Sequence, residues 1–182
     1  MGEKRGEWER LSSKIVHQNA YYAVREDAVI KPDGSKGTYH VVACKGASFI
    51  VAVDDSQRVY LIGQHRYPVN IYSIEVPSGG TEGKDPLAAA KRELKEETGL
   101  EASTWEALGV IHPSTGVIEE NNYVYLATNL KPSGKNRQKE EGINKILRVS
   151  FTKAFQMVKD GKITDGESIA SLTLAALKLG LR

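Results

Sequence analysis

Apolar residues gather in short segments along the first part of the chain, and these segments are rich in β-branched and aromatic residues, which is typical of β-strands. They are residues 14–18, 21–31, 38–43, 47–53, 58–64 and 72–76. Turn-forming residues separate two pairs of these segments, at Pro32-Asp33-Gly34 and at Asp54-Asp55-Ser56-Gln57. The pattern therefore predicts a small antiparallel unit followed by a second hairpin.

The pattern becomes helical over residues 86–98. Asp85 is a good N-cap, Pro86 suits the first helical position, and Gly99 can adopt the left-handed conformation that ends a helix. Further along, the same reasoning predicts strands at 104–112, 122–128 and 146–150 and helices at 152–160 and 166–179. Residues 131–142 are charged and lack an apolar period, which predicts a mobile loop. A sheet with helices inserted between its strands indicates an α/β fold.

The predicted helix gathers negative charge beside its apolar face. The apolar residues on that face are Leu87, Ala90 and Leu94. Glu93 and Glu97 are one turn apart, and Glu96 lies next to them. Like charges at this spacing repel each other, so a divalent cation over them would stabilise the helix. Mg²⁺ prefers oxygen ligands and binds phosphates as well, which favours a magnesium site for phosphate chemistry. The simpler alternative is a solvated, charged helix surface.

Composition and charge narrow the classes of function. The chain has 182 residues, which predicts one domain with at most a small appendage. Its formal charge of +2 argues against a dedicated nucleic-acid-binding protein, which would carry a concentrated basic face. Cys44 is the only cysteine, so no internal disulfide is expected. The polar start of the chain and the lack of a long apolar run predict a soluble, cytoplasmic protein with no membrane partner.

One run of residues resembles the signature of the Nudix hydrolases. The run is Arg92-Glu93-Leu94-Lys95-Glu96-Glu97-Thr98-Gly99-Leu100, preceded by the glycine-rich turn at Gly79, Gly80 and Gly83. Two upstream features depart from the signature. The gap after Gly79 is one residue short, and Lys84 stands where the signature has its first glutamate. The later glutamates are intact, so these departures affect the turn before the helix more than the carboxylates.

Other segments resemble the ADP-ribose pyrophosphatase branch of that family. They are Gln64-His65-Arg66-Tyr67, Ile74-Glu75-Val76-Pro77-Ser78-Gly79 and residues 161–168. Ser114-Thr115-Gly116 stands where the branch usually has Ser-Pro-Gly, so this segment matches only in part. The resemblance implies a Nudix α/β/α sandwich with a mixed sheet, preceded by a small antiparallel β unit. The implied domains are residues 1–44 and 45–182.

The resemblance also implies an activity. The expected reaction is the Mg²⁺-dependent hydrolysis of a nucleoside diphosphate linked to another group, with Mn²⁺ as an alternative metal. ADP-ribose is the leading substrate, and its products would be AMP and ribose 5-phosphate. Other diphosphates stay open as substrates, namely nucleotide sugars, dinucleotides and flavin adenine dinucleotide. A different class of function also stays open, a module that senses ADP-ribose without hydrolysing it.

Each candidate site residue receives a role from the resemblance and from its own chemistry. The predicted metal ligands are Glu93, Glu96, Glu97 and the backbone carbonyl of Ser78; Arg92 would hold the carboxylates in place. The predicted substrate-binding residues are Arg66, Glu75, Gly79 and Gly80, although Arg66 and Glu75 could instead form only an ion pair. Glu120 is the predicted catalytic base or an additional metal ligand, with Glu119 as its rival and Glu96 as the fallback.

The N-terminal strands are expected to mediate a homodimer. A unit of three strands is barely stable alone and leaves strand edges exposed, so pairing with a second copy would stabilise it. Enzymes of the branch that this chain resembles commonly dimerise through such a unit. The expected contacts include Tyr21, Tyr22 and Val24, with Arg25 and Glu26 near the partner's site. The alternative is that the unit packs on its own Nudix core.

Overall fold

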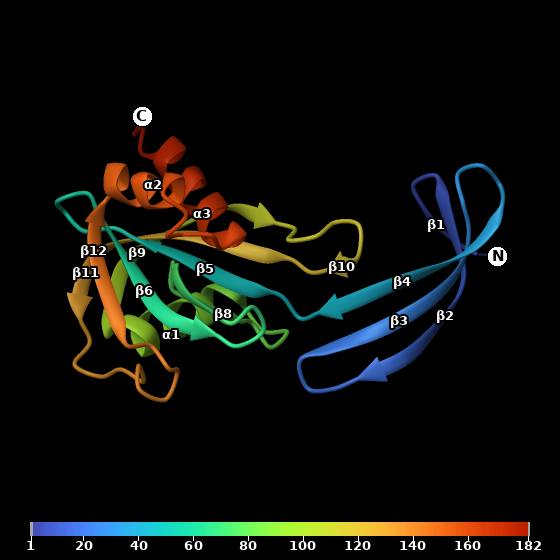
Figure 1. Ribbon diagram of the computed structural model, residues 1–182, viewed down its shortest axis with the longest axis horizontal. Helices are drawn as coiled ribbons and strands as arrows, with labels where there is room; N and C mark the ends of the chain where they lie inside the picture. The colour runs from blue at the N-terminus through green and yellow to red at the C-terminus, as the bar shows by residue number, and fades with distance from the viewer. Residues whose placement is uncertain (1, 182) are drawn as a thin grey trace. The chain divides into compact units, whose positions relative to one another are not determined.

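The computed structural model describes residues 2–181, and their contacts divide the chain into two compact units (Figure 1). Unit 1 contains residues 2–45 and His112–Asn121. Unit 2 contains Gly46–Ile111 and residues 122–181. The division near residue 45 lies close to the predicted domain boundary. The segment His112–Asn121, however, groups with the N-terminal strands rather than with the rest of the second predicted domain.

Unit 1 is built on a five-stranded sheet with the order β1-β2-β3-β4-β10. The strands are β1 (Glu3–Arg5), β2 (Trp8–Gln18), β3 (Tyr22–Ile30), β4 (Lys36–Cys44) and β10 (Ile118–Glu119). Strands β1 to β4 pair antiparallel, as predicted for the central three, and β10 pairs parallel to β4. The sequence pattern did not predict β1 and β10 because strands of three and two residues are too short to show a period.

Unit 2 contains two sheets, with the orders β8-β5-β11-β9 and β12-β6-β7. Their strands are β5 (Ala47–Ala52), β6 (Arg58–Arg66), β7 (Ile71–Glu75), β8 (Ser78–Gly80), β9 (Leu100–Ile111), β11 (Asn122–Pro132) and β12 (Lys145–Ser150). The first sheet is mixed, because β11 runs parallel to β5 and antiparallel to β9. Strand β11 continues to Pro132, so it includes the first residues of the predicted 131–142 loop.

Three helices complete unit 2: α1 (Pro86–Thr98), α2 (Phe151–Lys159) and α3 (Gly166–Lys178). The bounds of α1 are those that its capping residues predicted. The Asp85 carboxylate accepts hydrogen bonds from the backbone N–H groups of Leu87 and Ala88, which have no partner inside the helix. Gly99 has a φ of 73° and ends the helix in the left-handed conformation.

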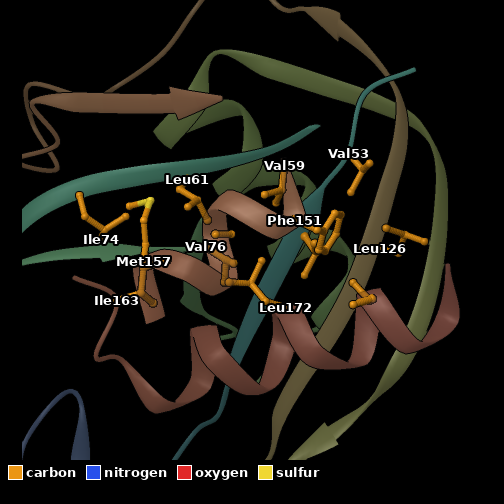
Figure 2. Packing of buried hydrophobic residues seen from close by; sticks show 14 of the residues in the cluster. Val53, Val59, Leu61, Ile74, Val76, Leu126, Phe151, Met157, Ile163 and Leu172 are labelled. Carbon is orange, nitrogen blue, oxygen red and sulfur yellow. The ribbon is translucent and has the colours of Figure 1, made fainter. Parts of the chain in front are cut away.

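Alternate residues of β5 point to opposite faces of the sheet and pack against different helices. Val51 belongs to a buried cluster with Phe151 and Met157 of α2 and Leu172 of α3 (Figure 2). Its neighbours on β5 form a second cluster with α1. That cluster comprises Ile50, Ala52, Ala90, Leu94 and Ala127. Helices therefore cover both faces of the central sheet of unit 2, and the predicted α/β/α sandwich with a mixed sheet is confirmed. No helix among the described residues is long and apolar enough to span a membrane.

Candidate functional site

Helix α1 places two carboxylates against the short strand β8. Glu93 and Glu97 are both buried, and they lie one turn apart on the side of α1 that contacts β8. The backbone N–H of Ser78 donates a hydrogen bond of 2.7 Å to Oε2 of Glu97. Arg92 donates one hydrogen bond of 2.5 Å to Oε1 of Glu93 and a second of 3.0 Å to the carbonyl oxygen of Gly80. Arg92 therefore joins the Glu93 carboxylate of α1 to the backbone of β8.

The lack of a side chain at Gly79 allows this close packing of α1 on β8. A Cβ atom at Gly79 would lie 2.7 Å from Cγ of Glu93 and closer still to its carboxylate carbon. Nothing lies within 4 Å of the corresponding position on Gly80. The Glu93 side chain therefore requires a glycine at position 79, whereas position 80 has room for a Cβ atom.

The electrostatic environment of these carboxylates favours a cation. Burial is the main cause that raises the pKa of Glu97 to about 8, and the negative charge of Glu93 adds to it against the opposing hydrogen bond from Ser78. Burial also raises the pKa of Glu93, although Arg92 opposes this shift. A positive ion between the two side chains would stabilise their ionised forms.

The carboxylates of α1 supply only part of the oxygen ligands that a Mg²⁺ ion needs. Among residues 2–181, no group of three or more His, Cys, Asp or Glu side chains is arranged to hold a metal ion. Mg²⁺ in enzymes of phosphate chemistry, however, usually keeps several waters and binds one or two carboxylates together with substrate phosphates. Glu93 and Glu97, two buried carboxylates next to the glycine backbone of β8, meet that requirement.

Arg66 and Glu75 form an ion pair next to the carboxylates of α1. Nε of Arg66 donates to both carboxylate oxygens of Glu75, at 2.9 and 3.1 Å, and Nη2 donates to Oε2 as well. Glu75 is buried, whereas the Arg66 side chain is 42% exposed. The hydrogen bonds from Arg66 to Glu75 raise the pKa of Arg66, and the charge of Glu97 contributes to the same shift. The ion pair that the sequence left as an alternative is thus present, and the fold brings it close to Glu97.

A segment between β11 and β12 also approaches α1. The backbone N–H of Arg137 donates to the carbonyl oxygen of Glu96 at 2.7 Å, and Nη1 of Arg137 lies 3.4 Å from Oε1 of Glu96. The negative charge of Glu141 contributes to the raised pKa values of both Glu93 and Glu97. Glu141 is therefore near enough to Glu93 and Glu97 for its charge to affect both carboxylates.

Comparison with known proteins identifies the family. A model of the NUDIX domain matches residues 45–172, and a model of the nucleoside diphosphate sugar hydrolase N-terminal domain matches residues 8–42. The chain belongs to the Nudix family. It is a Nudix hydrolase whose α1 carries the signature glutamates, and the family resemblance inferred from the sequence is confirmed.

Individual relatives of this Nudix hydrolase agree with that assignment. ADP-ribose pyrophosphatase of Mycobacterium tuberculosis is 34% identical over 169 residues, which are 91% of this chain and 82% of that protein. ADP-ribose pyrophosphatase of Bacillus subtilis is 28% identical over 153 residues, 83% of each chain. A crystal structure of an ADP compounds hydrolase superposes with a TM-score of 0.82 at 17% identity and covers 98% of this chain and 97% of that one. At that identity the superposition shows the fold.

The sequence did not single out Glu141 of this Nudix hydrolase. Glu141 lies in a charged segment without an apolar period, where one glutamate looks like any other. The one available signal for Glu141 was the apolar residue Ile143, two positions further along. Ile143 is buried in the structure, and a buried residue in a polar loop fixes the backbone next to it.

The predicted loop glutamates belong to unit 1, whereas the Nudix helix belongs to unit 2. Glu119 accepts a hydrogen bond of 2.7 Å from Nη2 of Arg25, which also binds Asp27. The carbonyl oxygen of Glu120 lies 3.1 Å from Nδ1 of His112. These contacts give Glu119 a structural partner on β3. The catalytic role of Glu120 stays a prediction.

Proposed function

We propose that this Nudix hydrolase cleaves the diphosphate of ADP-ribose, adding water to give AMP and ribose 5-phosphate. The observation that carries the proposal is the pair of buried carboxylates, Glu93 and Glu97, at the glycine turn of a Nudix helix. The 34% identity to an ADP-ribose pyrophosphatase over 91% of the chain supports the choice of substrate.

The residues of α1 and β8 would hold Mg²⁺, with Mn²⁺ as an alternative. Glu93, Glu96 and Glu97 would supply carboxylate oxygens, and Ser78 would supply its backbone carbonyl from β8. When bound, the ion supplies positive charge that offsets the charge of the diphosphate and makes its phosphorus easier to attack. The hydrogen bond from Arg92 orients the Glu93 carboxylate and opposes the rise in the pKa of Glu93 that burial causes.

The substrate would lie over the glycine turn, with Arg66 beside it. Gly79 and Gly80 remain the predicted substrate-binding glycines; of the two, Gly80 would let the diphosphate approach the backbone, because nothing lies within 4 Å of its Cβ position, whereas Glu93 fills that position at Gly79. Glu75 holds the guanidinium of Arg66 by a two-pronged pair, and the exposed part of Arg66 remains available to a phosphate or a nucleotide ring. Arg66 and Glu75 would thus bind substrate as a unit.

A base must take the proton from the attacking water, and two carboxylates are candidates. Glu120 is the residue that the sequence predicts. Glu141 is supported by its electrostatic interaction with both Glu93 and Glu97. A base near the carboxylates predicted to bind metal would be close to where the water is held.

A panel of diphosphates tests the proposed substrate. The purified protein is incubated with Mg²⁺ and, separately, with ADP-ribose, a nucleotide sugar, a dinucleotide and flavin adenine dinucleotide, and products are separated by chromatography. We expect ADP-ribose to show the highest kcat/KM and to yield AMP and ribose 5-phosphate in equal amounts. Binding of ADP-ribose without turnover would instead identify a sensing module.

Nucleotide sugars are the second candidate substrates. The family model that matches residues 8–42 describes the N-terminal domain of nucleoside diphosphate sugar hydrolases. Such substrates contain the same diphosphate and differ in the group beyond it, so the Nudix helix would act on them in the same way. A higher kcat/KM for a nucleotide sugar in the panel would replace ADP-ribose as the substrate.

We further propose that the sheet of unit 1 mediates a homodimer. Neither buried hydrophobic cluster includes a described residue of unit 1. Unit 1 exposes several large apolar side chains, namely Leu11, Ile15, Val16 and Tyr22 on its sheet and Tyr21 in the turn before β3. A second copy would cover such a surface. Light scattering that gave the mass of one chain, 20.0 kDa, at micromolar concentration would exclude the dimer. We also propose a cytoplasmic location. Cysteines are kept reduced there, and Cys44 is free in the structure.

A further inference from the structure

The segment between β11 and β12 is fixed to the end of the Nudix helix by backbone hydrogen bonds. The last carbonyl groups of an α-helix have no partner within it. In α1 the carbonyl oxygen of Glu96 accepts the N–H of Arg137 at 2.7 Å. Just beyond the helix, the carbonyl oxygen of Gly99 accepts the N–H of Ser133 at 2.8 Å. Two residues of the segment therefore dock on groups that the helix leaves unsatisfied.

The side chain of Arg137 adds two carboxylate contacts to this docking. Its Nη1 lies 3.4 Å from Oε1 of Glu96, and its Nε donates to Oε2 of Glu140 at 2.7 Å. One contact joins the segment to the helix, and the other joins Arg137 to the next turn of the segment itself. The planar guanidinium can serve both carboxylates at once, which a lysine ammonium on a flexible stem does less well.

The same residue sets the backbone around Glu141. The carbonyl oxygen of Arg137 accepts the N–H of Glu140 at 2.9 Å and that of Glu141 at 3.0 Å. On the far side, the N–H of Ile143 donates to the carbonyl oxygen of Gln138 at 2.8 Å, and the Ile143 side chain is buried. Glu141 therefore lies in a short turn held between Arg137 and a buried anchor.

We propose that Arg137 is a positioning residue, which holds the 133–144 segment, and Glu141 with it, at the C-terminal end of α1 by binding Glu96. The catalytic part of this inference rests on the proposed function, in which Glu141 is a candidate base. The anchoring part does not, because it concerns the segment and the helix alone. The Glu96 carboxylate, which is predicted to bind metal, would then also bind Arg137.

Hydrogen exchange tests the anchoring without any substrate. Amide exchange of the full chain is followed by mass spectrometry for the wild type, Arg137→Ala, Arg137→Lys and the control Lys139→Ala. The Lys139 side chain makes no ion pair or hydrogen bond with another residue in the range 2–181. Because exposed ion pairs are individually weak, we expect Arg137→Ala to speed exchange across residues 133–144 by about three- to tenfold, Arg137→Lys by less, and Lys139→Ala not at all. Unchanged exchange in Arg137→Ala would overturn the anchoring.

Steady-state kinetics test the positioning. With the diphosphate that the wild type cleaves fastest, Arg137→Ala should lower kcat by about three- to tenfold and leave KM within about twofold, because substrate is bound elsewhere. Arg137→Lys should recover part of the loss. Faster exchange with an unchanged kcat would overturn the positioning of Glu141. If the wild type cleaves no diphosphate, the proposed function fails, while the exchange experiment still decides whether Arg137 anchors the segment.

Discussion

Replacing Gly79 by alanine should move Glu93 and nearly abolish activity. The new Cβ would lie 2.7 Å from Cγ of Glu93, whereas carbon atoms in ordinary contact are about 3.5–4.0 Å apart. Cδ and Oε1 of Glu93 would lie closer still, so the Glu93 side chain must shift by at least about 1 Å. A shift of about 1 Å in an active-site group can cost about 10²-fold in rate, which corresponds to about 2.7 kcal/mol of transition-state stabilisation.

The assay compares Gly79→Ala with Gly166→Ala. Gly166 starts α3 and is not among the candidate site residues, and a Cβ added to it would meet no atom within 4 Å, so it is a matched change without a clash. Hydrolysis of ADP-ribose is measured over a range of Mg²⁺ concentrations, and thermal unfolding is measured for both variants. We expect kcat/KM to fall about 10²-fold in Gly79→Ala, with a higher Mg²⁺ requirement, and to stay near wild type in Gly166→Ala.

The melting temperature separates a local shift from a general loss of structure. Glu93 can move at the far end of a flexible side chain, so Gly79→Ala should unfold within a few degrees of the wild type. A Gly79→Ala variant that folds normally and keeps wild-type kcat/KM at limiting Mg²⁺ would refute the reasoning, because the position of Glu93 would then not matter to the metal.

Three other predictions follow from single residues. Glu141→Gln should lower kcat by about 10²–10⁴-fold if Glu141 is the base, and Glu120→Gln should do so if Glu120 is; steady-state kinetics of the two variants decide between them. The metal-free protein should lose stability as pH rises from about 4.5 to about 8, because over this range folded Glu97 retains a proton that the unfolded state has released. Denaturation in the presence of a chelator measures the free energy of unfolding at each pH, and this free energy should fall less steeply with pH in Glu97→Gln than in the wild type. Equal pH dependence of the two proteins would contradict the raised pKa. Arg66→Ala should raise KM more than it lowers kcat, because Arg66 is proposed to bind substrate. It should also destabilise the fold by about 1–3 kcal/mol, since buried Glu75 loses its charged partner. Unchanged kinetics would contradict the substrate-binding role of Arg66, and unchanged stability would contradict its role as the partner of Glu75.

Local physics determines much of the site. The ends of α1 depend on Asp85, Pro86 and Gly99, each of which acts on backbone groups within a few residues. Once the helix is fixed, its period places Glu93 and Glu97 on one side. The glutamates of the Nudix helix could therefore be identified from the sequence, and the α/β/α fold followed from the family resemblance that they carry.

Contacts between segments far apart in the sequence could not be predicted from such local causes. Arg66 and Glu75 left two interpretations open in the sequence, and their side chains meet in the structure although the register of β6 and β7 pairs Glu75 with Ile62 and Arg66 with Ile71. The position of Glu141 depends on Arg137 capping a carbonyl group forty-one residues away in the chain. The sequence of the segment contains no period that would reveal such a contact.

The sequence by itself determined the elements whose causes are local, namely the long strands, the capped helix and the stripe of carboxylates on it. Only the tertiary structure decided that the charged segment after β11 docks on α1 and brings Glu141 with it. The 112–121 segment, which carries the predicted base Glu120, instead joins the sheet of unit 1 through two residue pairs between β10 and β4. The physical reason is that a loop is positioned by the unsatisfied groups it meets in space, and these belong to residues far away in the sequence.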